Sequence, residues 1–284
     1  MSSTKELRQR IKSIGNTSKV TKAMEMVSAA KMRRAQEQAV GGRSYSELIN
    51  KVLKKMASRI DPSTHPLLTS EDDSKEAILL ITTNRGLVGA LNTNLFRKAL
   101  DFGKTVSFIT LGKKGSLYVS KMAEPMVADF ELTDHPNLQL AREISKFLIN
   151  SYLKGEFNKI SVIYTEFKST LNQVAMTRQL LPIIDEEILE MLKEEENSNT
   201  DFLFEPNADS VLEQVLPHYV LMEIYQVLLE AVASEHSARM VAMKNATDNA
   251  SELVDDLTLS YNQLRQANIT NELLDITTAA LALD

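Results

Sequence analysis

SEHSARMVAMKNATDNASEL (residues 234–253) lies inside the segment that decides the fold of this chain. From His218 to Asp284 the chain contains neither glycine nor proline. A helix over this segment, rising about 1.5 Å per residue, would be roughly 100 Å long. Because an isolated helix is only marginally stable in water, the sequence predicts a second helix that packs along it.

Small residues recur at every fourth position of this segment. They are Ser234, Ala238, Ala242, Ala246 and Ala250. A row of small residues on one face lets two helix backbones approach closely. The row therefore predicts a close helix–helix contact, although alanine is also common in helices simply because it is the best helix former.

The first 60 residues supply the expected partner helix. No proline precedes Pro62, and the segment VTKAMEMVSAAKMRRA (20–35) contains no glycine. Apolar residues in it, namely Val20, Ala23/Met24, Val27 and Ala30, are three or four positions apart, which is the period of a helix. This spacing predicts that the segment is helical.

The two ends of the chain carry opposite charge. Residues 1–60 contain 14 Lys/Arg and 4 Asp/Glu, a balance of +10, whereas residues 209–284 contain 3 Lys/Arg and 12 Asp/Glu, a balance of −9. Opposite charge favours pairing of the two terminal helices. A basic segment is also typical of nucleic-acid binding, but here no aromatic residue is interleaved before Tyr45, so we predict no nucleic-acid partner.

The middle of the chain alternates between strand and helix patterns. Short apolar runs rich in Ile, Val and Thr predict strands at 76–83, 105–111, 158–167 and 172–183. Helical patterns lie between them at 89–101, 113–122 and 138–153. This order is typical of a Rossmann-like α/β domain with a largely parallel sheet. Pro182 is expected near the end or edge of the last strand.

The predicted fold is therefore α + α/β, a long antiparallel coiled coil of terminal helices plus a Rossmann-like domain. Its three parts are an N-terminal coiled-coil helix (1–60), the α/β domain (75–206) and a C-terminal coiled-coil helix (208–284). The C-terminal helix is predicted to extend about 15–20 residues beyond the end of its partner helix. Its apolar end, ITNELLDITTAALALD (269–284), is therefore expected to be covered by another protein.

Catalytic motifs are not evident. The chain has no cysteine, and its four histidines are scattered without metal-ligand spacing. TTNRGLVGALN (82–92) and GKKGS (112–116) follow predicted strands, as phosphate loops do, but neither fits G-x-G-x-x-G or a Walker motif. No run of about 18 apolar residues predicts a membrane span. We predict no catalytic residue, metal site or cofactor.

Four stretches resemble one protein family, the gamma subunits of bacterial-type F-type ATP synthases. They are VTKAMEMVSAAKMRRA (20–35), TTNRGLVGALNTN (82–94), SEHSARMVAMKNATDNASEL (234–253) and RQANITNELLDITTAALA (265–282), in the family's order. The resemblance implies a central rotor shaft that turns inside a hexamer of alpha and beta subunits. It couples ion flow through a membrane ring to ATP synthesis or hydrolysis in the beta subunits.

The resemblance also implies roles for particular residues. Lys22, Met24, Arg265 and Gln266 match positions that contact beta subunits, although packing within the coil or plain solvation would equally explain them. The apolar end would turn in a collar of other chains, through Ile269, Leu273, Ile276, Ala280 and Leu283. Phe204 and Glu205 are expected at the foot, against the ring or the epsilon subunit, although phenylalanine stands here where the family tends to have tyrosine.

The partners implied are one alpha/beta hexamer, an epsilon subunit and a membrane c-ring, with one copy of this chain per complex. The expected location is the cytoplasmic face of the bacterial plasma membrane. Two alternatives remain open from the residues. An α/β enzyme with a helical arm predicts a polar, ligand-sized pocket at the carboxyl edge of the sheet. A static coiled-coil adaptor predicts symmetric self-association.

Overall fold

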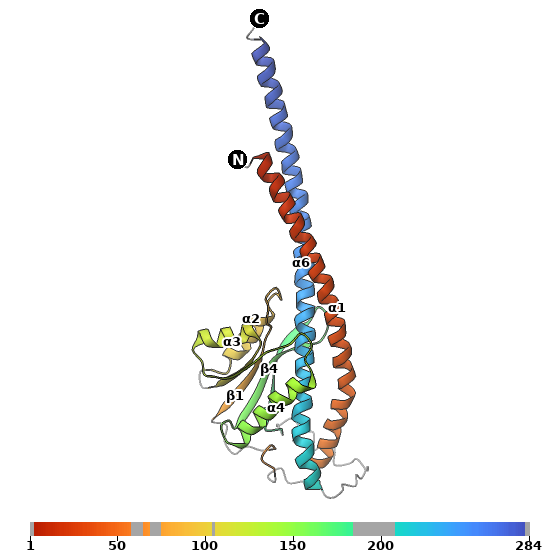
Figure 1. Cartoon of the computed structure of the whole chain (residues 1–284), viewed down its shortest axis with the longest axis vertical. Coiled ribbons are helices and arrows are strands. Elements are labelled where there is room, and N and C mark those ends of the chain that lie inside the picture. Colours follow the sequence, from red (N-terminus) through yellow and green to blue (C-terminus); the bar gives the residue numbers. More distant parts are fainter. Residues whose placement is uncertain (1–2, 58–64, 69–74, 104–105, 184–207, 282–284) are drawn as a thin grey trace. The chain divides into compact units, whose positions relative to one another are not determined.

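The computed structural model describes residues 3–57, 65–68, 75–103, 106–183 and 208–281. Two helices dominate it, α1 (Thr4–Ala57, 54 residues) and α6 (Ala208–Leu281, 74 residues) (Figure 1). The prediction of two long terminal helices is thus confirmed. The chain divides into two compact units, one formed by Met1–Ser28 with Arg239–Asp284 and the other by Ala29–Ala238.

The unit Ala29–Ala238 contains a five-stranded sheet in the order β3-β2-β1-β4-β5. The strands are β1 (Glu76–Ile81), β2 (Ser107–Leu111), β3 (Met126–Phe130), β4 (Lys159–Phe167) and β5 (Gln173–Leu181). All neighbours pair in parallel except β4 and β5, which are antiparallel. The prediction of a largely parallel, Rossmann-like sheet is therefore confirmed, and Pro182 directly follows β5 as expected.

One strand was missed by the sequence pattern. β3 is a five-residue edge strand, MVADF, that contains an acidic residue and has no fully buried residue. Because an edge strand is covered less than a central one, it does not need the apolar run by which the other strands are recognised. Its pairing with β2 shifts register between Phe108 and Ile109, which further weakens any regular pattern.

Helices cover both faces of the sheet (Figure 1). On one face, Ile78 and Leu80 of β1 pack in a cluster with α2 (Leu91–Leu100) and α3 (Lys113–Met122). On the other face, Leu79 and Ile81 share a cluster with α4 (Leu138–Leu153) and the first part of α6. Alternate residues of β1 thus enter two separate cores, which explains why the strand is apolar from Ala77 to Ile81.

The unit of Met1–Ser28 and Arg239–Asp284 is a paired-helix structure with a heptad seam. Its protected positions are spaced alternately three and four apart: Thr4, Leu7, Ile11, Ile14, Ser18, Thr21, Glu25 and Ser28 on α1, and Met243, Thr247, Ala250, Val254, Leu257, Tyr261 and Leu264 on α6. This spacing is that of a coiled coil. The Thr21 and Thr247 hydroxyls are hydrogen-bonded across it at 2.7 Å.

The most apolar face of this part of α1 does not form the seam. Val20 is 58% and Val27 56% accessible, and Ala23 and Ala30 are exposed as well. The seam lies on the adjacent face, where Thr21 and Ser28 allow close approach without apolar bulk. The helical period of this segment was predicted correctly, but the period alone did not indicate which face would be buried.

The row of small residues on α6 contacts two different parts of the chain. Ser234 donates a hydrogen bond to the carbonyl oxygen of Thr165 on β4, and Ala238 packs against the cluster that contains Ile78. The start of the row therefore meets the α/β domain. Ala250, farther along, lies in the seam with α1. The prediction of a helix–helix contact holds only for this later part.

Replacing Leu148 of α4 by alanine should test the core on the α6 side of the sheet. Leu148 is fully buried, so we expect the free energy of unfolding to fall by about 2–5 kcal/mol. Urea denaturation followed by circular dichroism measures it. Leu171→Ala removes the same side chain at an exposed position and should change stability by less than about 0.5 kcal/mol. Equal losses in both variants would contradict this assignment of the core.

Candidate functional surfaces

The carboxyl edge of the sheet, where many α/β proteins bind phosphate, is filled by the chain itself. Three N–H groups at the start of α3 have no partner within that helix. Lys113 N donates to Asn84 Oδ1 (3.2 Å), Lys114 N to the Thr83 carbonyl oxygen (3.1 Å) and Gly115 N to Thr82 Oγ1 (2.8 Å). Side-chain and backbone oxygens of the loop after β1 thus occupy the donors that a phosphate would use.

The glycines of GKKGS serve this contact. Gly112 has φ +100°, and a Cβ placed on it would lie 2.2 Å from the Thr82 carbonyl oxygen. A Cβ on Gly115 would lie 2.8 Å from Thr82 Oγ1. Thr82 could not approach α3 if either position carried a side chain. The second glycine motif is therefore explained by backbone packing between two βα turns.

The first glycine turn is held by its own polar residues. Asn92 Oδ1 accepts from Thr83 N (3.3 Å), and Asn92 Nδ2 donates to Thr83 Oγ1 (2.8 Å). Asn84 Nδ2 donates to the carbonyl oxygen of Leu132. These bonds fix the loop between β1 and α2 against its neighbours. TTNRGLVGALN is thus a structural joint of the domain.

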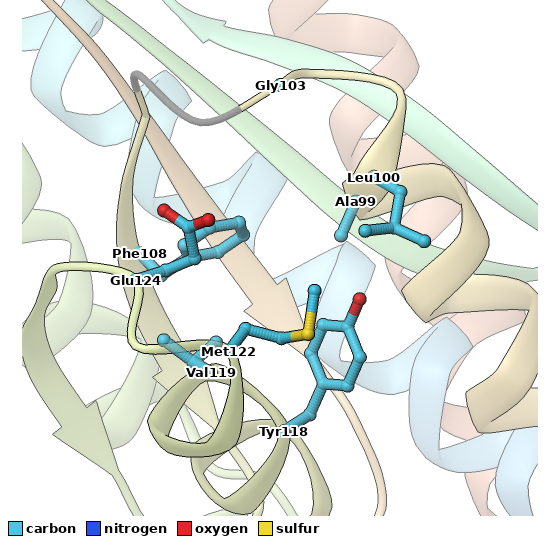
Figure 2. A pocket seen from close by; sticks show the side chains of 8 residues that line it. All are labelled: Ala99, Leu100, Gly103, Phe108, Tyr118, Val119, Met122 and Glu124. Carbon is cyan, nitrogen blue, oxygen red and sulfur yellow. The ribbon is translucent and has the colours of Figure 1, made fainter.

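A small pocket lies at the opposite end of the strands, between α2 and α3 (Figure 2). Its volume is about 230 Å³, and its lining residues are Ala99, Leu100, Gly103, Phe108, Tyr118, Val119, Met122 and Glu124. The lining is mainly apolar. Tyr118 Oη is buried and has no hydrogen-bond partner among the described residues, and burial raises the pKa of this phenol. The Tyr118 ring stacks on Phe96 at 4.0 Å.

A second hollow, of about 410 Å³, lies between α2 and β5. It is lined by Asn94, Arg97, Lys98, Asp101, Gln173, Val174 and Ala175. The first hollow lies away from the carboxyl ends of the parallel strands, where an α/β enzyme would bind its ligand. The second lies along α2, beside the β5 residues that pair with the carboxyl end of β4. In the part of the chain that the structure describes, no three His, Cys, Asp or Glu side chains are grouped to hold a metal ion.

The free end of α6 is the most distinctive surface of the chain. Every residue from Arg265 to Thr278 is exposed, including Ile269 (49%), Leu273 (58%) and Ile276 (66%). The seam with α1 ends at Leu264, and the next positions in the same heptad are polar: Asn268, Asn271, Asp275 and Thr278. Apolar residues occupy the neighbouring row instead. Within the described residues, α1 therefore leaves this stretch uncovered.

Pairing across the seam explains where the coil ends. Thr21 lies opposite Thr247, and the helices are antiparallel with equal rise per residue, so Thr4 at the start of α1 lies opposite about Leu264. Arg265 and Gln266 are the first residues beyond this point, and both are exposed.

Part of α6 has the length and hydropathy of a membrane-spanning helix, but 67% of that window is buried in the protein, as in an ordinary core helix.

The other predicted contact residues divide between surface and seam. Lys22 is exposed and pairs with Glu25 of the same helix at 3.0 Å, whereas Met24 is half-buried. The exposed apolar surface nearby consists of Val20, Met26 and Val27, which the sequence patterns did not assign to any partner. Of the remaining predicted sites, Phe204, Glu205 and Leu283 lie outside the described residues, and the side chain of Ala280 is not described.

Gly112→Ala should measure the contact between the two βα turns. A positive φ alone costs about 1–2 kcal/mol for a residue with a Cβ, and the collision with Thr82 adds to it. We expect a clear loss in the free energy of unfolding. The control is Gly86→Ala in the other glycine motif, where a Cβ meets nothing within 4 Å and little change is expected. A stable Gly112→Ala protein would refute the packing role.

Comparison with known proteins supplies a family. The sequence model of a family described as ATP synthase matches residues 3–283. The ATP synthase gamma chain of Opitutus terrae is 40% identical, with 99% of both chains covered, and that of Methylacidiphilum infernorum is 42% identical, with 100% of both covered.

Solved structures show the same fold at lower identity. The fold resembles a chain in the Euglena gracilis mitochondrial ATP synthase, with TM-score 0.70, 20% identity and coverage of 99% of this chain and 94% of that one. It also resembles a chain of the Tetrahymena thermophila mitochondrial ATP synthase central stalk and c-ring, with TM-score 0.61, 23% identity and coverage of 80% and 99%. On the strength of its full-length relatives, this chain belongs to the family of ATP synthase gamma chains.

Proposed function

We propose that this chain is the central-stalk gamma subunit of an F-type ATP synthase. It rotates inside a hexamer of alpha and beta subunits and couples ion flow through a membrane c-ring to ATP synthesis or hydrolysis in the beta subunits. The observation that carries this proposal is the apolar, exposed end of α6 beyond Leu264, in a chain whose relatives are gamma chains over their full length.

The chemistry of the proposed contacts is compatible with rotation. Apolar contact is non-directional, so an apolar helix end such as Ile269, Leu273 and Ile276 can turn in a collar without preferring one angle. Exposed basic side chains on α1, including Arg8, Lys12 and Lys19, would attract acidic surfaces of the surrounding subunits. Such long-range attraction changes little with angle, although salt weakens it.

Arg265 and Gln266 have a more specific role in this proposal. Both are exposed where the coiled coil ends, so they can reach a partner without breaking an intramolecular contact of the seam. An arginine offers a planar set of donors for carboxylate or backbone oxygens. They would therefore hydrogen-bond a beta subunit in one rotary state, and Lys22 with Met24 would mark the matching contact on α1.

The energetics require a stiff chain. One charge crossing 100 mV releases about 2.3 kcal/mol, so several must be accumulated for each ATP. In this proposal residues 1–60 and 208–284 form the shaft and residues 75–206 form the foot, with Phe204 and Glu205 near the ring or the epsilon subunit. The shaft biases the conformations of its partners, and chemistry occurs only in them. One copy per complex, at the cytoplasmic face of the bacterial membrane, completes the proposal.

Native mass spectrometry of the complex purified through this chain tests the assignment. We expect one copy of the chain with three alpha and three beta subunits, and we expect the purified chain alone to hydrolyse no ATP. A symmetric assembly of this chain with itself would favour the static adaptor. ATP hydrolysis by the isolated chain would favour the α/β enzyme with a helical arm.

Removal of residues 270–284 tests the bearing role. Because apolar contacts add up along the helix, we expect torque and coupling to decrease gradually as the chain is shortened to 281, 277 and then 269, while assembly with the hexamer persists. Single-molecule rotation of the assembled hexamer measures torque, and pull-down measures assembly. Complete loss of binding at the first truncation would be incompatible with a bearing.

A further inference from the structure

The first part of α6 lies on the sheet through apolar contacts that do not by themselves fix its angle. Leu216, Val220, Ile224 and Leu228 are buried in the same cluster as Val162 of β4. Apolar burial depends on area rather than direction. A large turn of the helix about its axis would expose these side chains and is opposed by their burial. A small turn or slide changes the buried area little, so polar contacts of defined geometry add resistance to it.

One polar attachment joins α6 to the edge strand. Arg178 of β5 donates from Nη1 to Glu223 Oε2 of α6 at 2.9 Å, and its guanidinium lies 5.8 Å from the centre of the Tyr164 ring. The Glu223 side chain is only 10% exposed, whereas that of Arg178 is 47% exposed. Breaking the pair would leave a carboxylate nearly buried without its cation, which is strongly unfavourable.

A second polar attachment lies 11 to 14 residues farther along α6. Ser234 Oγ donates to the Thr165 carbonyl oxygen at 3.0 Å, and Ser237 Oγ donates to the Thr170 carbonyl oxygen at 2.8 Å. Gln173 Nε2 in turn lies 3.3 Å from Ser237 Oγ. Both serines are fully buried. The acceptors are backbone oxygens of β4 and the loop after it, so they cannot swing away as a side chain can.

We propose that these two attachments are the torque joint between the α/β domain and the shaft. At 1.5 Å per residue they are about 16–21 Å apart along α6, so together they oppose both sliding and axial turning of the helix on the sheet. α6 is one helix from Ala208 to Leu281, so a rotation imposed on its first part reaches its far end. This inference rests on the proposed rotary function, since a static subunit carries no torque.

Variants at the two attachments should soften the joint without preventing assembly. The test set is Arg178→Glu, Arg178→Gln, Ser234→Ala with Ser237→Ala, and the charge-exchanged pair Arg178→Glu with Glu223→Arg. The matched control is Arg142→Glu, which reverses an exposed charge on α4. The readouts are torsional stiffness, ions pumped per ATP in membranes, and the ATPase rate of the soluble hexamer that contains this chain.

The chain itself offers a way to attach the probe. It has no cysteine, so Lys121→Cys, at an exposed position on α3, gives a single site for a magnetic bead on the α/β domain. With the hexamer immobilised, turning the bead strains the joint directly. We expect at least about a twofold fall in stiffness and a lower pumping ratio for Arg178→Glu and for the double serine variant. ATPase of the soluble hexamer should stay unchanged, and the charge-exchanged pair should recover stiffness.

Unchanged stiffness and pumping in assembled complexes of both Arg178→Gln and the double serine variant would overturn the inference. If Arg178→Glu fails to fold, Arg178→Gln still decides, because it keeps a long polar side chain without the charge. The inference would also be overturned if the loss of stiffness in these variants were no larger than the loss in Arg142→Glu. If the wild-type complex itself shows no rotation of the bead, the proposed function fails, which is a distinguishable result.

Discussion

Burial of one side of α6 against the sheet is the interaction on which the unit Ala29–Ala238 depends. Leu216 and Leu228 are completely buried, and the strands beneath them have both faces covered. Because a parallel sheet must be covered on both sides and α4 covers only part of this face, removal of α6 would leave the rest of the face exposed. The helix is therefore part of the domain core at one end and part of the coiled coil at the other.

The sequence predicted the elements well where breakers and apolar runs were decisive. The absence of glycine and proline after His218 indicated a single long helix, and α6 extends unbroken to Leu281. Composition could not predict the phase of α1, because the seam there uses Thr21 and Ser28 while Val27 faces outward. A coil that packs closely needs small residues inside, so hydrophobicity alone selects the wrong face.

The candidate sites also differ in how far the sequence could predict them. The spacing of the glycines indicated that the two turns are not phosphate loops. Their actual role, the close approach of Thr82 to Gly112, is visible only in the structure. Likewise Arg178 and Glu223 are 45 residues apart in sequence, and no pattern indicates that they meet. The exposed end of α6 was predictable because it follows from the unequal lengths of two helices.

The uncovered stretch from Arg265 to Thr278 has a consequence for the cell that makes this chain. Newly synthesised copies present the apolar side chains of this helix end to the solvent, and under the proposed function they remain exposed until the chain assembles with its partners. Exposed apolar surface of this kind promotes aggregation and engages chaperones and proteases. Copies produced in excess of their partners would thus be lost to aggregation or degradation, so the physical chemistry of one helix end favours balanced expression of the whole assembly.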